Sequence, residues 1–450
     1  MGEYFHSVTL DKEKCMGCTN CIKKCPTEAI RVRDGKAYII GERCIDCGEC
    51  IRVCPYHAKV AVTDPLSSID KFKYKIALPA PTLYGQFKKL SSIEDVLHGL
   101  KTLGFDDVFE VARGADYATA FIKHQLENRD LSKPVISSAC PAIARLIQVR
   151  FPELIPNLID VESPMELAAQ IAKDEYSKKH HVDIDEIGAF FITPCAAKMT
   201  SIKNPLGTDR CSVDGAISIL DIYGPLSSAM RESISSGNLQ NATFKGVAWA
   251  NSGGEGNSLG IDNYLAVDGI NNVMKVLEEI ENNKLSDLDF FEGLACIGGC
   301  VGGPLVFENN FIAQNRLKKL INKMEHHLPM PQEEVNKALK KYHWQTDKKI
   351  LPKSIMKLDD SIIVAMKKME EMERIYESLP GLDCGSCGSP SCRALAEDIV
   401  RGNATEFDCT IKLREKVRLL AKQMLEISDY IPTGKERKTT KERGIEDENK

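Results

Sequence analysis

The sequence predicts a multidomain protein of mixed α/β and α+β class, with a small cysteine-rich module towards each end and a larger α/β domain between them. Its 450 residues are enough for about three domains of ~150 residues each. Most of its 17 cysteines fall into clusters. In the middle of the chain, short apolar runs at 134–136 and 189–192 lead into loops, as the buried strands of α/β proteins do.

The composition excludes several classes of protein. Apolar residues make up 43% and charged residues 27% of the chain, as in globular proteins. The net charge of −5 argues against a nucleic-acid-binding surface. No apolar run reaches the ~18–20 residues of a membrane span, and residues 1–10 lack the pattern of a secretory signal. We therefore expect a cytoplasmic protein, whose thiols stay reduced and whose clustered cysteines bind metal or act in catalysis.

Two cysteine runs near the N-terminus share the pattern C-x2-C-x2-C-x3-C-P. In such runs, three closely spaced thiolates hold one iron–sulfur cube and the fourth cysteine ligates the other cube. The spacing therefore predicts two [4Fe–4S] clusters, one on Cys15, Cys18, Cys21 and Cys54 and the other on Cys44, Cys47, Cys50 and Cys25. A pair of zinc sites is disfavoured, because zinc needs only two C-x2-C halves. Residues 8–62 resemble a bacterial two-cluster ferredoxin, which implies an electron-transfer module.

A third cluster of cysteines follows a leucine–proline–glycine turn near residue 380. It has the spacing C-x2-C-x4-C-x16-C and comprises Cys384, Cys387, Cys392 and Cys409. Four thiolates can bind either a [4Fe–4S] cluster or zinc, so the spacing alone leaves both open. The segment resembles the small four-cysteine [4Fe–4S] domain of corrinoid iron–sulfur proteins and of ion-pumping ferredoxin oxidoreductases. We therefore predict a third iron–sulfur cluster here.

Four cysteines in the middle of the chain lie where predicted strands end. Cys140 and Cys195 follow the two apolar runs, and Cys296 and Cys300 form a C-x3-C pair among several glycines. Strand-end loops are where α/β proteins place their sites, so the four thiolates can meet in one cleft. The remaining Cys211 is expected to be a buried structural thiol.

These segments resemble the three signature motifs of the [FeFe]-hydrogenase catalytic domain, over about residues 75–305. The matching residues are Ser-Ser-Ala139-Cys140-Pro, Thr193-Pro-Cys195-x-x-Lys198 and Glu292-x-Leu294-Ala-Cys296-x-x-Gly-Cys300-x-x-Gly-Gly. The resemblance implies a two-lobed α/β catalytic domain. It also implies an H-cluster: a [4Fe–4S] cube on the four cysteines, with Cys300 shared by a two-iron subsite that carries CO, cyanide and a dithiolate amine.

The resemblance assigns further residues and partners to this cofactor. The buried ammonium of Lys198 would bind a cyanide ligand through a charge-assisted hydrogen bond, unless it is an ordinary surface lysine. The step Pro81-Thr82 is the candidate for a second cyanide contact, with Pro79-Ala80 as the rival register. Thr193 and Leu294 replace two methionines that pack against the two-iron subsite. The implied partners are H2, protons, a redox partner such as ferredoxin, and the hydrogenase maturation machinery.

The chain departs from the family where protons should travel. Ala139 replaces the cysteine that donates protons to the site, and a methyl group carries none. Phe121 and Ile122 replace two glutamates of the relay, and Ile159 replaces its serine. The usual proton route is therefore interrupted in several places. Glu255 and Glu162 are the candidate replacement relays, and ordinary surface carboxylates are the alternative.

Three functions fit this pattern. The first is a slow, anaerobic hydrogenase that senses H2 or redox state, similar to the sensory [FeFe]-hydrogenases, which share the alanine and the C-terminal four-cysteine domain. Such a sensor needs a separate signalling protein, because the sequence contains no visible output module. The second is a metabolic ferredoxin-linked hydrogenase, and the third is an iron–sulfur electron carrier without the two-iron subsite.

The predicted domain boundaries follow from these motifs. We expect a two-cluster module at 1–70, a catalytic domain at 71–330, a helical connector at 331–378, a C-terminal cluster domain at 379–430 and a disordered tail at 431–450. The helical periodicity of residues 355–379 predicts a helix that packs on a core.

Overall fold

The structure, a computed structural model, describes residues 5–233, 237–324, 330–353, 355 and 357–428. The predicted tail at 431–450 therefore lies outside the described residues. The chain divides into two compact units, Met1–Met356 and Lys357–Lys450, with a boundary inside the predicted connector. Among the described residues, no helix combines the length and apolar character that crossing a membrane requires.

The first unit begins with a small module built from two similar halves. Its strands form two antiparallel pairs, β1 (Val8–Leu10) with β4 (Lys59–Ala61) and β2 (Ile30–Arg33) with β3 (Lys36–Ile39). The turn between β2 and β3 places Asp34 and Gly35 at positive φ, as a tight two-residue hairpin requires. Each cysteine run supplies one short helix, α1 (Asn20–Lys23) or α2 (Glu49–Arg52).

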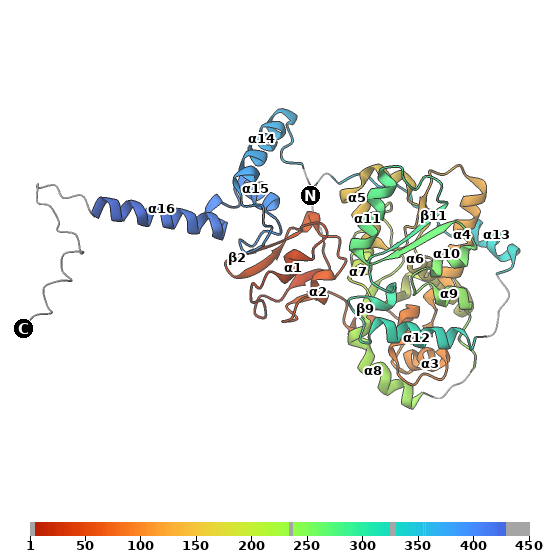
Figure 1. Cartoon of the computed structure of the whole chain (residues 1–450). Coiled ribbons are helices and arrows are strands. Elements are labelled where there is room, and N and C mark those ends of the chain that lie inside the picture. Colours follow the sequence, from red (N-terminus) through yellow and green to blue (C-terminus); the bar gives the residue numbers. More distant parts are fainter. Residues whose placement is uncertain (1–4, 234–236, 325–329, 354, 356, 429–450) are drawn as a thin grey trace, which may run out of the picture. The chain divides into compact units, whose positions relative to one another are not determined.

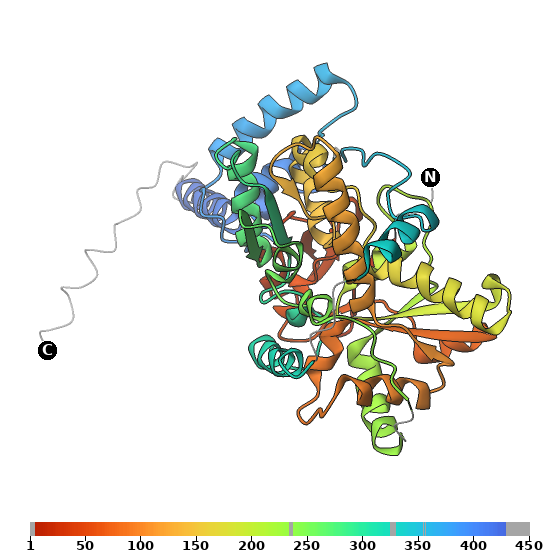
Figure 2. The same ribbon diagram turned by 90° about the vertical axis from the view of Figure 1, so that its right-hand side faces the viewer.

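A parallel four-stranded sheet forms one lobe of the next domain (Figures 1 and 2). In spatial order its strands are β6 (Asp107–Val108), β5 (Tyr74–Pro79), β8 (Ile187–Thr193) and β9 (Gly215–Ser218). Every residue of β8 is buried, because helices cover both faces of the sheet. This explains the continuous apolar run that predicted the strand.

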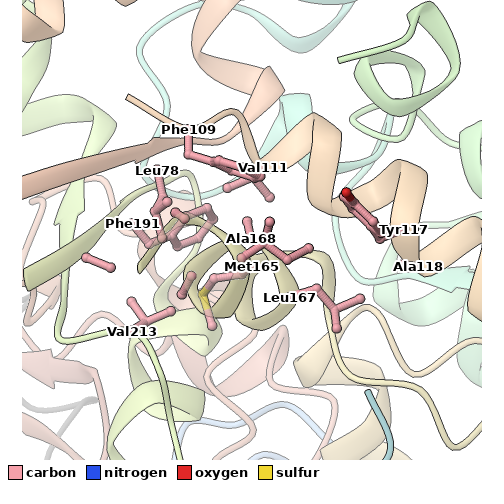
Figure 3. Close-up of a cluster of buried hydrophobic side chains, with 14 of the residues drawn as sticks. Leu78, Phe109, Val111, Tyr117, Ala118, Met165, Leu167, Ala168, Phe191 and Val213 are labelled. Atoms are coloured by element: carbon pink, nitrogen blue, oxygen red, sulfur yellow. The ribbon is translucent and has the colours of Figure 1, made fainter. Parts of the chain in front are cut away.

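Alternate residues of the sheet face two separate hydrophobic cores. Ile76 and Leu78 pack with α4 (Val111–Asn128) and α6 (Pro164–His180) on one face. Ala77 belongs to the other core, with α3 (Ile93–Thr102) and α8 (Ile219–Glu232). Figure 3 shows part of the first core, including side chains that also line the cavity described below.

A second lobe is built on a parallel three-stranded sheet, so the domain is two-lobed and of α/β type. Its strands are β10 (Tyr264–Asp268), β11 (Phe290–Leu294) and β7 (Val135–Ile136). Its core joins α5 (Pro141–Arg150) and α11 (Ile270–Glu281) to this sheet. The remaining helices of the first unit are α7 (Ala196–Lys203), α9 (Phe244–Ala248), α10 (Gly254–Leu259), α12 (Asn310–Ile321) and α13 (Gln332–Lys341).

Within its described residues, 357–428, the second unit contains three α-helices, α14 (Ile362–Ser378), α15 (Cys392–Val400) and α16 (Thr410–Ser428). A small core gathers Met372, Leu379 and Leu395 around Cys392 and Cys409. The expectation that the helix near residues 355–379 packs on a core is correct only for its second half. Its first turns instead expose large apolar side chains, namely Ile362, Ile363, Met366 and Met369.

Candidate metal centre

Four cysteines from three strand ends surround one cavity in the first unit. Cys140 follows β7 at the start of α5, and Cys195 follows β8 at the start of α7. Cys296 and Cys300 follow β11. All four line the same hollow, here called the central cavity. Burial raises the pKa of the Cys300 thiol well above its usual value, and the nearby thiols of Cys140, Cys195 and Cys296 raise it further.

Glycines let the three cysteine-bearing loops approach at backbone distance. Gly299 has φ 91°, and a Cβ there would lie 2.6 Å from the Ser252 nitrogen. A Cβ on Gly303 would lie 2.2 Å from the Pro194 oxygen. The glycines after Cys296 therefore serve close packing between loops, which agrees with the sequence interpretation.

Some of the residues predicted to contact the cofactor line the central cavity, and one does not. Pro81, Thr82 and Leu294 line the central cavity, as does Ala80, whereas Thr193 is not among its lining residues. The hydroxyl of Thr193 instead accepts a hydrogen bond from the Cys195 nitrogen and donates one to the Cys195 oxygen, both at 3.0 Å. Thr193 therefore shapes the turn that carries Cys195.

The size and lining of the central cavity fit a group larger than one iron–sulfur cube. Its free space, including the mouth, is about 970 Å³, against about 340 Å³ for each cysteine cavity of the N-terminal module. The lining is mostly apolar, with Phe191 and Met165 among it. The buried hydroxyl of Thr82 has no hydrogen-bond partner among the described residues, so it is available to a bound group.

Lys198 on α7 lines the central cavity and also a larger, more polar cavity beside it. Burial lowers the pKa of Lys198, while the nearby thiols of Cys195 and Cys300 oppose that shift. A buried ammonium is costly unless an anion compensates its charge. Lys198 is therefore not an ordinary surface lysine: it is a half-buried residue of the cavity wall whose ammonium a bound anion would stabilise.

Glu255 also lines the central cavity, beside Ala139. Its Oε2 accepts a hydrogen bond of 2.6 Å from Ser137, and the Ser137 hydroxyl accepts one of 3.2 Å from the Ala139 nitrogen. The Oε1 of Glu255 is buried without a hydrogen-bond partner among the described residues. Burial and the neighbouring carboxylate of Glu292 raise the pKa of Glu255 to about 8.

Glu292 on β11 accepts hydrogen bonds from the backbone nitrogens of Gly253 (2.9 Å) and Gly256 (3.0 Å). Burial raises its pKa to about 7 despite these bonds. Two buried carboxyl groups that repel each other retain a shared proton near neutral pH. The half-buried Asp268 on β10 adds a further negative charge near Glu292.

Glu162 lies apart from Glu255. It lines the larger polar cavity, together with Glu166 and Cys211, and is not among the residues of the central cavity. Burial and the charge of Glu166 raise the pKa of Glu162 to about 8. The thiol of Cys211 donates to Glu166 Oε2 at 3.5 Å, so this cysteine is a half-buried hydrogen-bonding group.

Packed hydrocarbon occupies the three positions at which the sequence predicts an interrupted proton relay. Phe121 and Ile122 are buried in the core between α4 and α6, and the Phe121 ring lies 5.4 Å from that of Trp344. Ile159 is buried at the wall of the larger polar cavity. None of these three side chains can carry a proton.

The eight N-terminal cysteines fall into two cavities. Cys15, Cys18, Cys21 and Cys54 line one, and Cys25, Cys44, Cys47 and Cys50 line the other. Backbone nitrogens of Ala29 and Ala58 donate to the sulfurs of Cys25 (3.2 Å) and Cys54 (3.3 Å). Such N–H···S bonds stabilise thiolate ligands and tune cluster potentials.

The C-terminal cysteines differ from one another in exposure. Cys392 and Cys409 are buried in the small core of the second unit, and Cys387 packs against it. Cys384 lies in the exposed loop before them. The Cys392 nitrogen donates to Asp383 at 2.6 Å, which fixes the loop at the start of α15.

Sequence reasoning missed two polar groups beside the central cavity. It assigned no role to Ser137, which joins Glu255 to the loop of Cys140 across 118 residues. It named Glu292 as part of the third signature motif and assigned no role to its side chain. Neither side chain has a local sequence signal for its partner, although the position of Glu292 in that motif was a hint.

Comparison with known proteins identifies the family. The family described as "Iron only hydrogenase large subunit, C-terminal domain" matches residues 73–258 and 224–304, which together make up just over half of the chain. The chain belongs to the iron-only hydrogenase family. A 4Fe-4S dicluster domain family matches residues 7–55, and an Fe-S cluster family matches residues 379–411. In this member of the iron-only hydrogenase family, the segments that match iron–sulfur families therefore lie on both sides of the segment that matches the large-subunit domain.

The chain is similar to several members of this family. The periplasmic [Fe] hydrogenase large subunit of Nitratidesulfovibrio vulgaris is 30% identical over 212 residues, which are 43% of this chain and 50% of the relative. Iron hydrogenase 1 of Clostridium pasteurianum is 25% identical over 400 residues, 71% of this chain and 69% of the relative. The chain thus spans about half the length of the first relative.

A solved structure of the [FeFe]-hydrogenase HydA1 from Chlamydomonas reinhardtii has the same fold. It superposes with a TM-score of 0.50 at 16% identity, over 64% of this chain and 98% of that chain. Together with the dicluster match, this likeness confirms the predicted fold class, a ferredoxin-like module joined to an α/β hydrogenase domain.

Proposed function

We propose that this member of the iron-only hydrogenase family interconverts H2 with two protons and two electrons at an H-cluster in the central cavity. We further propose that turnover is slow and serves H2 or redox sensing. The observation that carries the proposal is the shared lining of one cavity by four cysteines, Lys198 and the free hydroxyl of Thr82. The hydrocarbon at position 139 of the same cavity supports the low turnover.

In this proposal Cys140, Cys195, Cys296 and Cys300 hold the cube, and Cys300 is shared with the two-iron subsite carrying CO, cyanide and a dithiolate amine. When bound, that group supplies an open iron position for H2, a base for one proton and a path for electrons. Lys198 holds an anionic ligand by a charge-assisted hydrogen bond. Pro81 and Leu294 shield the site from water.

Glu255 is the proton relay that the geometry favours. It lines the central cavity, whereas Glu162 lines only the neighbouring one. The Ser137 hydroxyl fixes its Oε2, so a proton at neutral pH is held at Oε1, the atom without a partner among the described residues. Glu292 and the half-buried Asp268 are the acidic groups proposed to continue the route, because the charge of Glu292 acts on Glu255 and that of Asp268 acts on Glu292. Donation from a carboxylic acid with a pKa near neutrality suits general acid–base work.

The remaining modules suit electron exchange with a partner. We propose two [4Fe–4S] clusters in the N-terminal module and one in the C-terminal domain, which pass electrons to and from a redox partner such as ferredoxin. A sensor further needs a separate signalling protein, and the maturation machinery must insert the two-iron subsite. The proposed domains remain those predicted from the sequence, 1–70, 71–330, 331–378 and 379–430.

Infrared spectroscopy and H2 assays on the matured protein test this function. We expect bands in the CO and cyanide stretching region and a low rate of H2 evolution with a strong chemical reductant. A high rate would support the metabolic hydrogenase instead. Absence of the bands after maturation would leave an iron–sulfur electron carrier.

Replacing Ala139 by cysteine is expected to change H2 evolution by less than about tenfold. One added thiol cannot restore a relay in which Phe121, Ile122 and Ile159 are hydrocarbon. The measurement is the H2 evolution rate of matured A139C, compared with A115C, which adds a thiol at another alanine of the same cavity. A gain of several orders of magnitude in A139C alone would show that the relay is interrupted only at position 139.

A further inference from the structure

The side chain of Arg52 crosses from the N-terminal module to the loop that carries Cys296 and Cys300. Arg52 ends α2, inside the second cysteine run. Its Nη2 donates to the Gly302 oxygen at 2.8 Å, across 250 residues of sequence. Its positive charge also acts on Cys296, where it opposes the rise that burial causes in the pKa of that thiol. Arg52 forms a further ion pair with Glu49 at 3.0 Å.

The surrounding packing is close enough for two metal clusters to share this arginine. Cys47, a predicted ligand of the module, also lines the central cavity. The neighbouring Gly48 has φ 74°, and a Cβ there would lie 2.5 Å from the Pro304 side chain. The charge of Arg52 acts on both Cys47 and Cys296. No other residue type combines a permanent charge with several fixed donors in this way.

If the i,i+3 ion pair of Arg52 with Glu49 were an isolated surface pair, it would contribute little to stability. The side chain of Arg52 is, however, only 26% exposed, and one nitrogen is committed to the Gly302 carbonyl. A cationic donor near a cluster sulfur stabilises the reduced cluster, which carries one more negative charge. It therefore raises the reduction potential of that cluster.

We propose that Arg52 is a positioning residue that holds the second cysteine run against the Cys296–Gly302 loop and raises the reduction potential of the central cube. The inference rests on the proposed function only in requiring a cube on the four central cysteines. A residue of the N-terminal module then helps to set the reduction potential of the central cube, with which that module exchanges electrons.

The N-terminal module offers a matched control for this proposal. Lys23 occupies the position in the first cysteine run that Arg52 occupies in the second, three residues after the start of its helix and two before the fourth cysteine. It is exposed, and it does not line the central cavity. K23Q therefore removes one positive charge from the module without touching the central cysteines.

The experiment is a redox titration of full-length protein loaded with iron and sulfide but without the two-iron subsite, followed by electron paramagnetic resonance. We expect R52Q to shift the equilibrium of the central cube about tenfold towards the oxidised form, which is 59 mV for one electron. K23Q should leave that cube within twofold of wild type. R52K keeps the charge but loses the fork of donors, so it should show a smaller shift in the same direction.

The proposal is overturned if the reduction potential of the central cube is unchanged in R52Q, or if K23Q shifts it by the same amount. Where R52Q fails to hold its cubes, an unchanged potential in R52K overturns it. Failure of the proposed function looks different. In that case wild-type protein lacks any cube signal that disappears on replacing Cys140, before Arg52 is changed at all.

Discussion

Cys300→Ala is expected to abolish the CO and cyanide infrared bands and to reduce H2 turnover to the background of the assay. Cys300 is the only central cysteine assigned to both the cube and the two-iron subsite, and it lines the central cavity. A methyl group in its place cannot bridge metals. The measurement is infrared spectroscopy and an H2 assay on protein matured in parallel with wild type.

Cys211→Ala is the control for this substitution. Cys211 is half-buried and lines the neighbouring cavity, outside the four cysteines of the central one. We expect C211A to retain the infrared bands and the wild-type turnover. CO and cyanide bands that persist in C300A would mean that the two-iron group is held by other residues. The iron–sulfur absorption of the N-terminal module should stay unchanged in both variants.

Glu255→Gln is expected to lower H2 turnover by about 10²–10⁴-fold, the range typical of a lost general acid–base group. An amide has the same shape as the carboxyl group and can still accept the Ser137 hydrogen bond, but it cannot transfer a proton. The measurement is H2 evolution and oxidation by matured protein whose infrared bands show a normal cofactor. E162Q is the matched control, because Glu162 has a similarly raised pKa but lines only the larger cavity.

E255Q is expected to lower turnover but to raise thermal stability. A stability measurement therefore separates the loss of a proton relay from misfolding. Burial raises the pKa of Glu255 to about 8 in the folded protein, so folding takes up a proton there. The contribution of Glu255 to the free energy of unfolding therefore falls as pH rises from about 4.5 to about 8. E255Q removes this contribution and should raise the melting temperature relative to wild type at pH 8, with little difference at pH 4. A lower melting temperature at pH 8, or an equal loss of turnover in E162Q, would contradict the relay.

The sequence predicted best those features whose signals are local. The N-terminal cysteines lie a few residues apart, and their spacing is itself the geometry of a cluster site. The apolar run at 189–192 predicted β8 because a strand covered on both faces must be apolar throughout. The motif residues around Cys140, Cys195 and Cys300 predicted a shared cleft because α/β proteins place their sites at strand ends. That two sheets build the cleft, with Cys195 after β8 of one and Cys140 and Cys300 after β7 and β11 of the other, was not predicted.

Features that join distant segments could not be predicted in this way. The bond from Ser137 to Glu255 and the bond from Arg52 to Gly302 depend on how two separate elements pack. The hydrogen bond by which Thr193 closes a turn depends on the local backbone conformation. A polar residue after an apolar run does not by itself predict that conformation. The exposed first turns of α14 were misjudged for the related reason that helical periodicity shows an apolar face but not whether anything covers it.

Each cavity of the N-terminal module draws three cysteines from one run and one from the other: Cys54 crosses to the first and Cys25 to the second. Neither half is therefore a self-sufficient unit. With cubes bound in both cavities, damage to one by oxygen would free a ligand in the opposite run and loosen its anchoring. Assembly and loss of the pair should thus be all-or-none, and an electron entering through this module depends on both halves surviving together.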